Sequence, residues 1–378
     1  MNKFIPVCEP LFNGNEKKYV LNAIETGWIS SAGKYIPAFE NAFAEFCGVK
    51  YGIAVNNGTV ALHLALVALG IGKGDEVIIP DFTMIASAFA VCYTGAKPVF
   101  VDANKTTWNI DIMKIEEKIT DKTKAIMPVH IYGHPCDMEP IWQIAKKYNL
   151  HIIEDAAEAH GAEYYGKRCG SLGDIAAFSF FANKIATTGE GGMVLTNNDE
   201  LSEKCRYYKN LCFPRAGERD YIHNDIGFNY RMSNLQAAIG LAQVEKLNYY
   251  IKLRKKNNAL YQKYLREVPG LIFQPEKEGY KNVYWMNGVV IERDKFGISR
   301  DELVRRLKEV KIDTRVFFKG MHLQKSLRDY GCDYNDSFYI TEWLGDNGLY
   351  LPSGSGLSKE QIEYVSNQII SIHKQSKC

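Results

Sequence analysis

The sequence predicts an α/β protein built on a mostly parallel seven-stranded sheet with helices on both faces, plus a smaller α+β domain. Three observations support this prediction. Short apolar runs rich in β-branched residues occur between about residues 50 and 200, helical patterns separate them, and long amphipathic segments follow after about residue 230. Strands buried on both faces are continuously apolar rather than alternating. Their alternation with helices indicates a parallel sheet covered on both sides.

Seven runs are the expected strands of the large sheet. They are residues 51–55, 76–80, 98–101, 125–130, 151–154, 175–180 and 192–196. Helices are expected between them, for example at 60–69 and 138–148. The stretch 211–229 carries prolines, glycines and charges with little periodicity, and a loop of that length is usually functional or part of an interface.

The C-terminal part has a different pattern. It predicts helices at 234–247, 251–268, 300–310 and 358–372, with strands at 283–291 and 314–318. A chain of 378 residues exceeds the length at which one core usually stops growing. We therefore expect a large α/β domain over residues 14–250 and a small α+β domain over residues 251–378, which residues 1–13 join.

Composition argues against several classes of protein. The net charge of +2, from 46 basic and 44 acidic residues, gives no broad basic field for nucleic acid or an anionic membrane. No apolar run reaches the roughly 18 residues of a membrane span, and Pro6 and Glu9 interrupt the start before a signal core could form. Nine scattered cysteines without a C-x-x-C pair indicate reduced thiols in a cytoplasmic protein. The histidines lack metal-site spacing, so we expect no metal.

Two segments that follow expected strands suggest ligand binding. Gly58 and Thr59 lie at a strand-to-helix turn, where free backbone amides and the helix dipole suit a phosphate. The same turn could be no more than a helix N-cap. Asp155 ends a buried strand, at the edge where open α/β sheets bind ligands. Its carboxylate could face a cationic ring nitrogen, or it could only cap a helix.

Lys184 lies between an apolar strand and the glycine-rich stretch 187–192. Partial desolvation there would lower the pKa of its amine and free it to form an imine. A lone lysine in a polar loop is usually just solvated. A phosphate turn, a strand-end aspartate and a lysine after a later strand, however, occur in the order that pyridoxal 5'-phosphate (PLP) chemistry needs. The glycines at 70, 72 and 74 follow a helix and precede a strand, the reverse of a dinucleotide fingerprint, so they predict a turn.

Over nearly its whole length, the chain resembles the fold-type-I PLP aminotransferases of the DegT/DnrJ/EryC1/StrS family. The most specific matches are the segments 179–184, 189–192 and 227–232. Within the family, the segment 187–193 is most similar to GDP-perosamine synthases.

The resemblance implies a role at each matching position. Lys184 would bind PLP covalently and move protons, and Asp155 would pair with the pyridine nitrogen. The other implied contacts are Gly58, Thr59 and Ser179 with the phosphate, Glu158 with the ring hydroxyl side, Asn229 with the phosphate of a neighbouring subunit, and His322 with the sugar. Arg231 would position a group, contact the substrate or serve only the structure. Where the family often has an aromatic residue over the ring, this chain has Met84, so either Met84 or Phe82 would cover it.

The resemblance also implies a reaction. A homodimer with shared active sites would move an amino group from L-glutamate to a keto-sugar nucleotide. The sharpest expectation is GDP-4-keto-6-deoxy-mannose giving GDP-perosamine for a surface polysaccharide such as O-antigen. The alternatives are amination of a dTDP- or UDP-linked keto-sugar at C3 or C4, of a keto-inositol, or of a small phosphorylated ketone.

The residues argue against two other classes of protein. A PLP-dependent sugar dehydratase has histidine where Lys184 stands, so Lys184 argues against it. A non-catalytic sensor would not need Lys184, Asp155 and Ser179 together.

Overall fold

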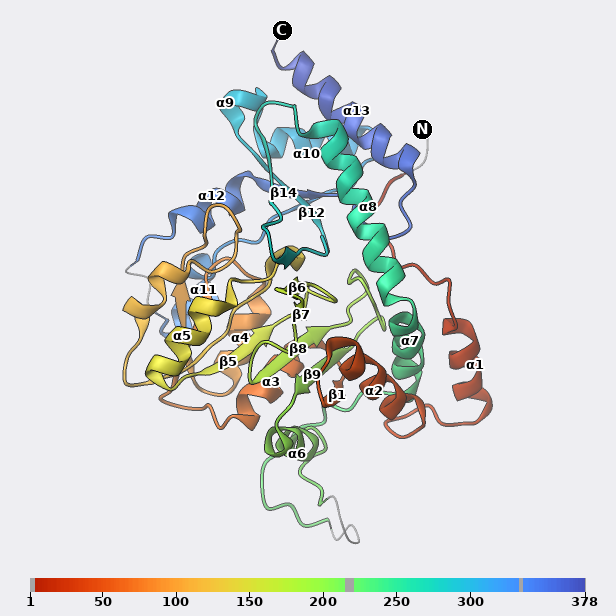
Figure 1. The fold of residues 1–378 in the computed structure, drawn as a ribbon, viewed down its shortest axis with the longest axis vertical. Helices are drawn as coiled ribbons and strands as arrows, with labels where there is room; N and C mark the ends of the chain where they lie inside the picture. The colour runs from red at the N-terminus through yellow and green to blue at the C-terminus, as the bar shows by residue number, and fades with distance from the viewer. Residues whose placement is uncertain (1–3, 215–220, 333–335, 378) are drawn as a thin grey trace.

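The computed structural model describes residues 4–214, 221–332 and 336–377. Its centre is a seven-stranded sheet with the strand order β1-β9-β8-β5-β4-β2-β3 (Figure 1). The strands are β1 (Tyr51–Val55), β2 (Glu76–Pro80), β3 (Lys97–Val101), β4 (Thr123–Ile126), β5 (His151–Asp155), β8 (Ile175–Ser179) and β9 (Gly192–Thr196). Only β9 runs antiparallel to its neighbours, β1 and β8. The predicted mostly parallel seven-stranded sheet is therefore confirmed.

Helices cover both faces of this sheet because successive strand residues point to opposite sides. In β1, Ala54 belongs to one apolar cluster, whereas Ile53 and Val55 belong to another. The first cluster is filled by α2 (Tyr35–Cys47), α5 (Met138–Tyr148) and α7 (Asn234–Glu245). The second is filled by α3 (Gly58–Ala68), α4 (Ile85–Tyr93) and α6 (Asp199–Tyr208). Helix α1 (Glu16–Glu25) packs on α7.

The prediction of a strand over 125–130 is too long, because β4 ends at Ile126. Pro128 has no backbone N–H to donate to the ladder. Its carbonyl instead accepts a hydrogen bond from the amide of Asp155, 2.9 Å away. The chain therefore leaves the sheet just where the cavity described below begins.

The C-terminal part forms an antiparallel sheet with the order β10-β12-β14-β13, packed on three helices. Its elements are β10 (Leu271–Phe273), β12 (Asn287–Ile291), β13 (Arg315–Val316), β14 (Gly348–Leu351), α8 (Leu247–Leu265), α10 (Arg300–Glu309) and α13 (Lys359–Gln375). The predicted strand over 283–291 is wrong in its first half, because Val283 and Trp285 hydrogen-bond instead to the turn at 132–133. Strands β10 and β14 and the helix α12 (Tyr339–Asn347) were not predicted.

The described residues form several further short elements. They are α9 (Arg293–Phe296), α11 (Lys325–Tyr330), the four short 3₁₀ helices η1 (Ile112–Lys114), η2 (Glu116–Lys118), η3 (Ile131–Gly133) and η4 (Met321–Leu323), and a three-stranded sheet of β6 (Glu163–Tyr164), β7 (Lys167–Arg168) and β11 (Tyr280–Lys281). Helix α8 follows α7 after the single turn residue Lys246 and extends from the large sheet to α13 (Figure 1). The domain division near residue 250 stays a prediction. None of the described helices combines the length and the apolar character that crossing a bilayer requires.

Candidate active site

A cavity of about 660 Å³ opens at the carboxyl ends of β5 and β8, beside the first turns of α3 and α4. Ligands bind at this edge in open α/β sheets. Seven of the predicted site residues line it, namely Gly58, Thr59, Met84, Asp155, Glu158, Ser179 and Lys184. Segments that lie far apart in the sequence therefore meet in one place.

The phosphate-binding candidates form one wall of this cavity. Asn57 caps α3, since its side chain accepts a hydrogen bond from the amide of Val60 at 3.0 Å. Gly58 lies so close to the end of β8 that an added Cβ would come within 2.7 Å of the Ser179 Cβ. The hydroxyls of Thr59 and Ser179 therefore lie beside the start of a helix. Hydroxyl donors and a helix N-terminus suit a phosphate group.

Asp155 is buried at the end of β5, where the register places it beside Ala177 of β8. Its Oδ2 accepts a hydrogen bond from the Ser87 hydroxyl at 2.7 Å, and its Oδ1 accepts one from the Ala157 amide at 3.2 Å. Burial raises the pKa of this carboxyl, while the two hydrogen bonds and the charge of Lys184 act in the opposite direction. A cationic ring nitrogen in the cavity would add a further charge that favours the ionised form.

The Lys184 amine lies inside the same cavity. Its Nζ is 3.9 Å from Glu158 Oε1 and 3.8 Å from the centre of the Trp285 ring. Burial lowers the pKa of Lys184, and the carboxylates of Glu158 and Asp155 oppose that shift. A desolvated amine loses its proton more easily and can then attack an aldehyde.

Glu158 is held by an unusual turn. Its Oε2 accepts a hydrogen bond from the Tyr132 amide at 2.7 Å. Tyr132 has a φ of 55°, a left-handed conformation that is unfavourable for a residue other than glycine. The strained turn directs this amide at the carboxyl group. Burial raises the pKa of Glu158 to about 7, so the group changes charge near neutral pH.

Replacing Glu158 by glutamine is expected to shift the pH dependence of PLP uptake by the cofactor-free protein. The Glu158 carboxylate raises the pKa of Lys184, so its removal lowers that pKa and makes the neutral amine available at lower pH. We expect the profile of uptake rate, followed by visible absorbance, to move down by about one pH unit. The exposed Glu45 provides the control variant Glu45→Gln, which should leave the profile in place. If the pH profile of PLP uptake by Glu158→Gln does not shift, or shifts to higher pH, Glu158 does not raise the pKa of Lys184 as proposed.

Met84 and Phe82 lie in different places. Met84 lines the cavity with its side chain 48% exposed. Phe82 is fully buried and its ring packs against Tyr132 and Phe317. Of the two residues that were candidates to cover a bound ring, Met84 is the one that lines the cavity.

Three predicted residues lie outside the cavity lining. The His322 ring has its Nδ1 2.6 Å from Asp81 Oδ2 and its Nε2 3.2 Å from Glu342 Oε1. The exposed Asn229 accepts a hydrogen bond from Arg231 Nε at 3.0 Å. None of the three is among the residues that line the cavity, so their roles stay predictions.

Sequence reasoning missed the far wall of the cavity, which Trp285, Phe318 and Tyr350 form. The Trp285 indole N–H donates to the carbonyl of Asn183 at 2.9 Å, which fixes the ring next to Lys184. Each of these aromatic residues follows more than 100 positions after Lys184, and a lone aromatic residue in a chain is usually part of a core. No local pattern could have identified them.

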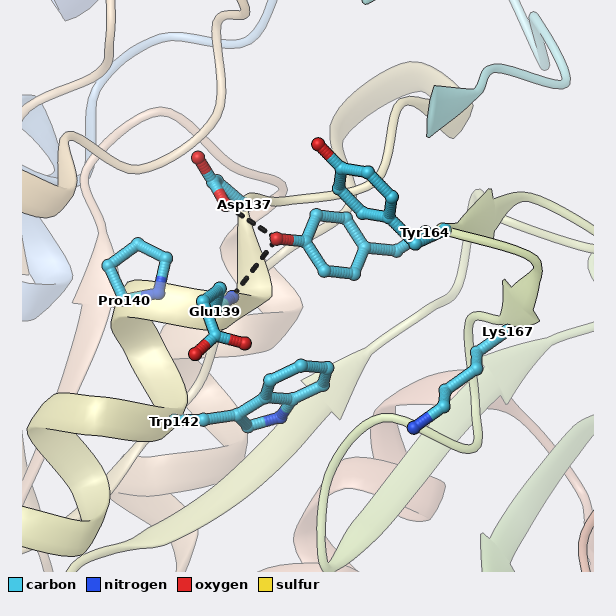
Figure 2. A pocket seen from close by; sticks show the side chains of 7 residues that line it. Asp137, Glu139, Pro140, Trp142, Tyr164 and Lys167 are labelled. Carbon is cyan, nitrogen blue, oxygen red and sulfur yellow. Dashed lines mark hydrogen bonds between the residues drawn. The ribbon is translucent and has the colours of Figure 1, made fainter. Parts of the chain in front are cut away.

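A second pocket, of about 540 Å³, lies between the start of α5 and the β6–β7 hairpin (Figure 2). There the Tyr164 hydroxyl accepts a hydrogen bond from the Glu139 amide at 3.2 Å and donates one to Asp137 Oδ1 at 2.8 Å. None of the predicted site residues lines it. Seven of the predicted site residues line the first cavity instead.

The residues of the first cavity fit PLP as a set. A helix N-terminus with Thr59 and Ser179 suits its phosphate, and the buried Asp155 suits its ring nitrogen. The amine of Lys184 suits its aldehyde. All of these groups line one cavity.

Comparisons with known proteins show the family of the chain. A family model described as the DegT/DnrJ/EryC1/StrS aminotransferase family matches residues 11–370. The GDP-perosamine synthase of Caulobacter vibrioides is 47% identical over 96% of each chain, and that of Escherichia coli O157:H7 is 46% identical over 97% of this chain and 98% of the relative. The crystal structure of DesV from S. venezuelae with a ketimine intermediate superimposes with a TM-score of 0.88 at 34% identity, over 96% and 95% of the two chains. The chain therefore belongs to the DegT/DnrJ/EryC1/StrS aminotransferase family and is a PLP-dependent aminotransferase.

Proposed function

We propose that this enzyme transfers an amino group from L-glutamate to GDP-4-keto-6-deoxy-mannose and forms GDP-perosamine, a precursor for surface polysaccharide. The likeness to two GDP-perosamine synthases over nearly the full length of each chain carries this choice of substrate. The eight described cysteines are all free thiols, which supports the expected cytoplasmic location.

When bound, PLP supplies an electron sink for the negative charge that develops at the carbon losing its proton. We propose that Lys184 holds the cofactor and, once displaced by the incoming amine, carries that proton between carbon atoms. Glu158, 3.9 Å away, sets the charge of the Lys184 amine. Asp155 keeps the ring nitrogen protonated, and Gly58, Thr59 and Ser179 anchor the phosphate so that the ring stays in place.

Two half-reactions share the cavity in this proposal. Glutamate gives up its amino group first, and the keto-sugar accepts it after 2-oxoglutarate has left. Lys184 serves both steps as the proton carrier because no second buried lysine lines the described cavity. We expect ping-pong kinetics, which give parallel lines in double-reciprocal plots. Intersecting lines would contradict the shared site.

A panel assay tests the proposed substrate. Purified enzyme with PLP and glutamate is offered GDP-, dTDP- and UDP-linked 4-keto-6-deoxy sugars, a keto-inositol and a small phosphorylated ketone. Product masses identify which acceptor is aminated. We expect the GDP-linked sugar to give a kcat/KM at least about tenfold above each competitor, equivalent to ~1.4 kcal/mol of discrimination. Preferred amination of another acceptor would overturn the substrate and keep the reaction class. Loss of a hydroxyl without amination would instead support a dehydratase.

We further propose a homodimer in which Asn229 completes the phosphate site of its partner. Asn229 is exposed and lies outside the cavity of its own chain. Large apolar side chains are also exposed at the cavity, Phe181 by 45% and Met84 by 48%, which is typical of a surface that another chain covers.

Complementation between inactive variants tests the shared site. Lys184→Ala and Asn229→Asp are each expected to be inactive, the second because a carboxylate would face the phosphate. In a mixed dimer, one site would carry both changes and the other neither. Random pairing should therefore restore about a quarter of the wild-type activity. A mixture that exchanges subunits but stays inactive, or a monomer by light scattering, would count against a shared site.

A further inference from the structure

The first turn of α4 carries Ser87, which is not among the residues that line the cavity. Ser87 is fully buried, and its Oγ lies 2.7 Å from Asp155 Oδ2. The buried Thr83, which lines the cavity, has its Oγ1 2.9 Å from the same Ser87 oxygen. Three side chains thus form a continuous hydrogen-bonded row that ends on the carboxyl group proposed to face the ring nitrogen.

The direction of this row follows from what each group can donate. An ionised carboxylate only accepts, so the single hydroxyl proton of Ser87 is committed to Asp155. The Ser87 oxygen then accepts the hydroxyl proton of Thr83. Hydrogen bonds in a chain polarise one another, and bonds to an ionised acceptor are the stronger ones. Thr83 and Ser87 therefore both favour the ionised form of Asp155.

The hydrogen bond from Ser87 counteracts the effect of burial on Asp155. Burial raises the pKa of Asp155, and among the contacts that lower this pKa the hydrogen bond from Ser87 has the largest effect. The same turn of α4 also begins with Met84, whose side chain lines the cavity. The start of α4 therefore supplies both Ser87, which hydrogen-bonds Asp155, and Met84, which lines the cavity where the PLP ring is expected.

We propose that Ser87 is a positioning residue, which holds Asp155 ionised and aimed at the ring nitrogen of PLP, and that Thr83 orients Ser87. This inference rests on the proposed role of Asp155. Without the Ser87 hydroxyl, Asp155 becomes more basic and loses its fixed orientation. The proton between the ring nitrogen and Asp155 then shifts toward the carboxylate, and the ring becomes a weaker electron sink.

The test reads the ring nitrogen directly. PLP labelled with ¹⁵N in the ring is bound to the wild-type enzyme, Ser87→Ala, Ser87→Thr and Thr83→Val, and its NMR shift is recorded at neutral pH. For Ser87→Ala we expect the shift to move toward that of an unprotonated pyridine. The rate of the glutamate half-reaction in a single turnover should fall about tenfold, the change that one pKa unit produces.

The other variants make the test specific. Ser87→Thr keeps the hydroxyl and should retain the wild-type signal. Thr83→Val keeps the volume and should show a smaller shift in the same direction, which tests the row even if Ser87→Ala does not fold. A Ser87→Ala enzyme that is slow but has the wild-type ¹⁵N shift would reduce Ser87 to a packing role and overturn the proposal. An unchanged ¹⁵N shift in Thr83→Val would overturn the part assigned to Thr83. Neither readout uses a keto-sugar, so a wrong acceptor in the proposed function would leave both expectations intact.

Discussion

Replacing Lys184 by alanine is expected to reduce kcat by at least about 10⁴-fold, because the variant loses both its nucleophile and its proton carrier. The amine is buried, with its Nζ 3.9 Å from Glu158 Oε1, and no other lysine lines the described cavity to replace it. Single-turnover absorbance with glutamate and product analysis by mass spectrometry measure the loss.

The Lys184→Ala variant should still fold. The charge of Lys184 lowers the pKa of Glu158, which burial has raised to about 7. Without Lys184 that pKa rises further, so Glu158 stays neutral near pH 7 and no unpaired charge is buried. Thermal unfolding provides the check, and Lys167→Ala, at the rim of the second pocket, is the matched lysine control. Transamination that continues at near wild-type rates in Lys184→Ala would reject the assignment.

Replacing Asp155 by asparagine should have the second-largest effect. The amide keeps the shape of the side chain and can still accept from Ser87, but it has no charge to hold a proton on the ring nitrogen. We expect kcat to fall about 10³-fold, a loss typical of removing a group that stabilises charge in the transition state.

The ¹⁵N shift of labelled PLP should report an unprotonated ring in Asp155→Asn. Asp121 is exposed, and the control variant Asp121→Asn should match the wild-type enzyme in both kcat and ¹⁵N shift. An Asp155→Asn enzyme that keeps a protonated ring nitrogen and most of its kcat would show that another group supplies the counter-charge.

The large domain could be predicted from the sequence because its signals are local. Strands buried on both faces, such as β2 and β9, are continuous apolar runs, and their predicted bounds agree with the structure. The cofactor candidates Gly58, Asp155 and Lys184 were predictable for the same reason, since each follows or ends such a run. The carboxyl ends of neighbouring strands meet at one edge, so separate motifs come together in one cavity.

The small domain was harder to predict because its order depends on distant partners. Strand β10 has three residues and β14 four, too few to show a period, and both pair with β12. Trp285 lies just before β12, where the chain bends to hydrogen-bond with Tyr132 rather than to extend the strand. The aromatic wall of the cavity therefore depends on tertiary contacts that no window of the sequence contains. The roles of Asn229, Arg231 and His322 stay predictions.

The proposed mechanism requires a covalent bond between PLP and the amine of Lys184, and chemical trapping tests that bond most directly. The enzyme loaded with PLP is reduced with borohydride, digested and mapped by mass spectrometry. We predict a single stably labelled peptide that carries the reduced cofactor on Lys184. A label on a different lysine, or a protein that binds PLP without any reducible bond, would contradict the proposed site.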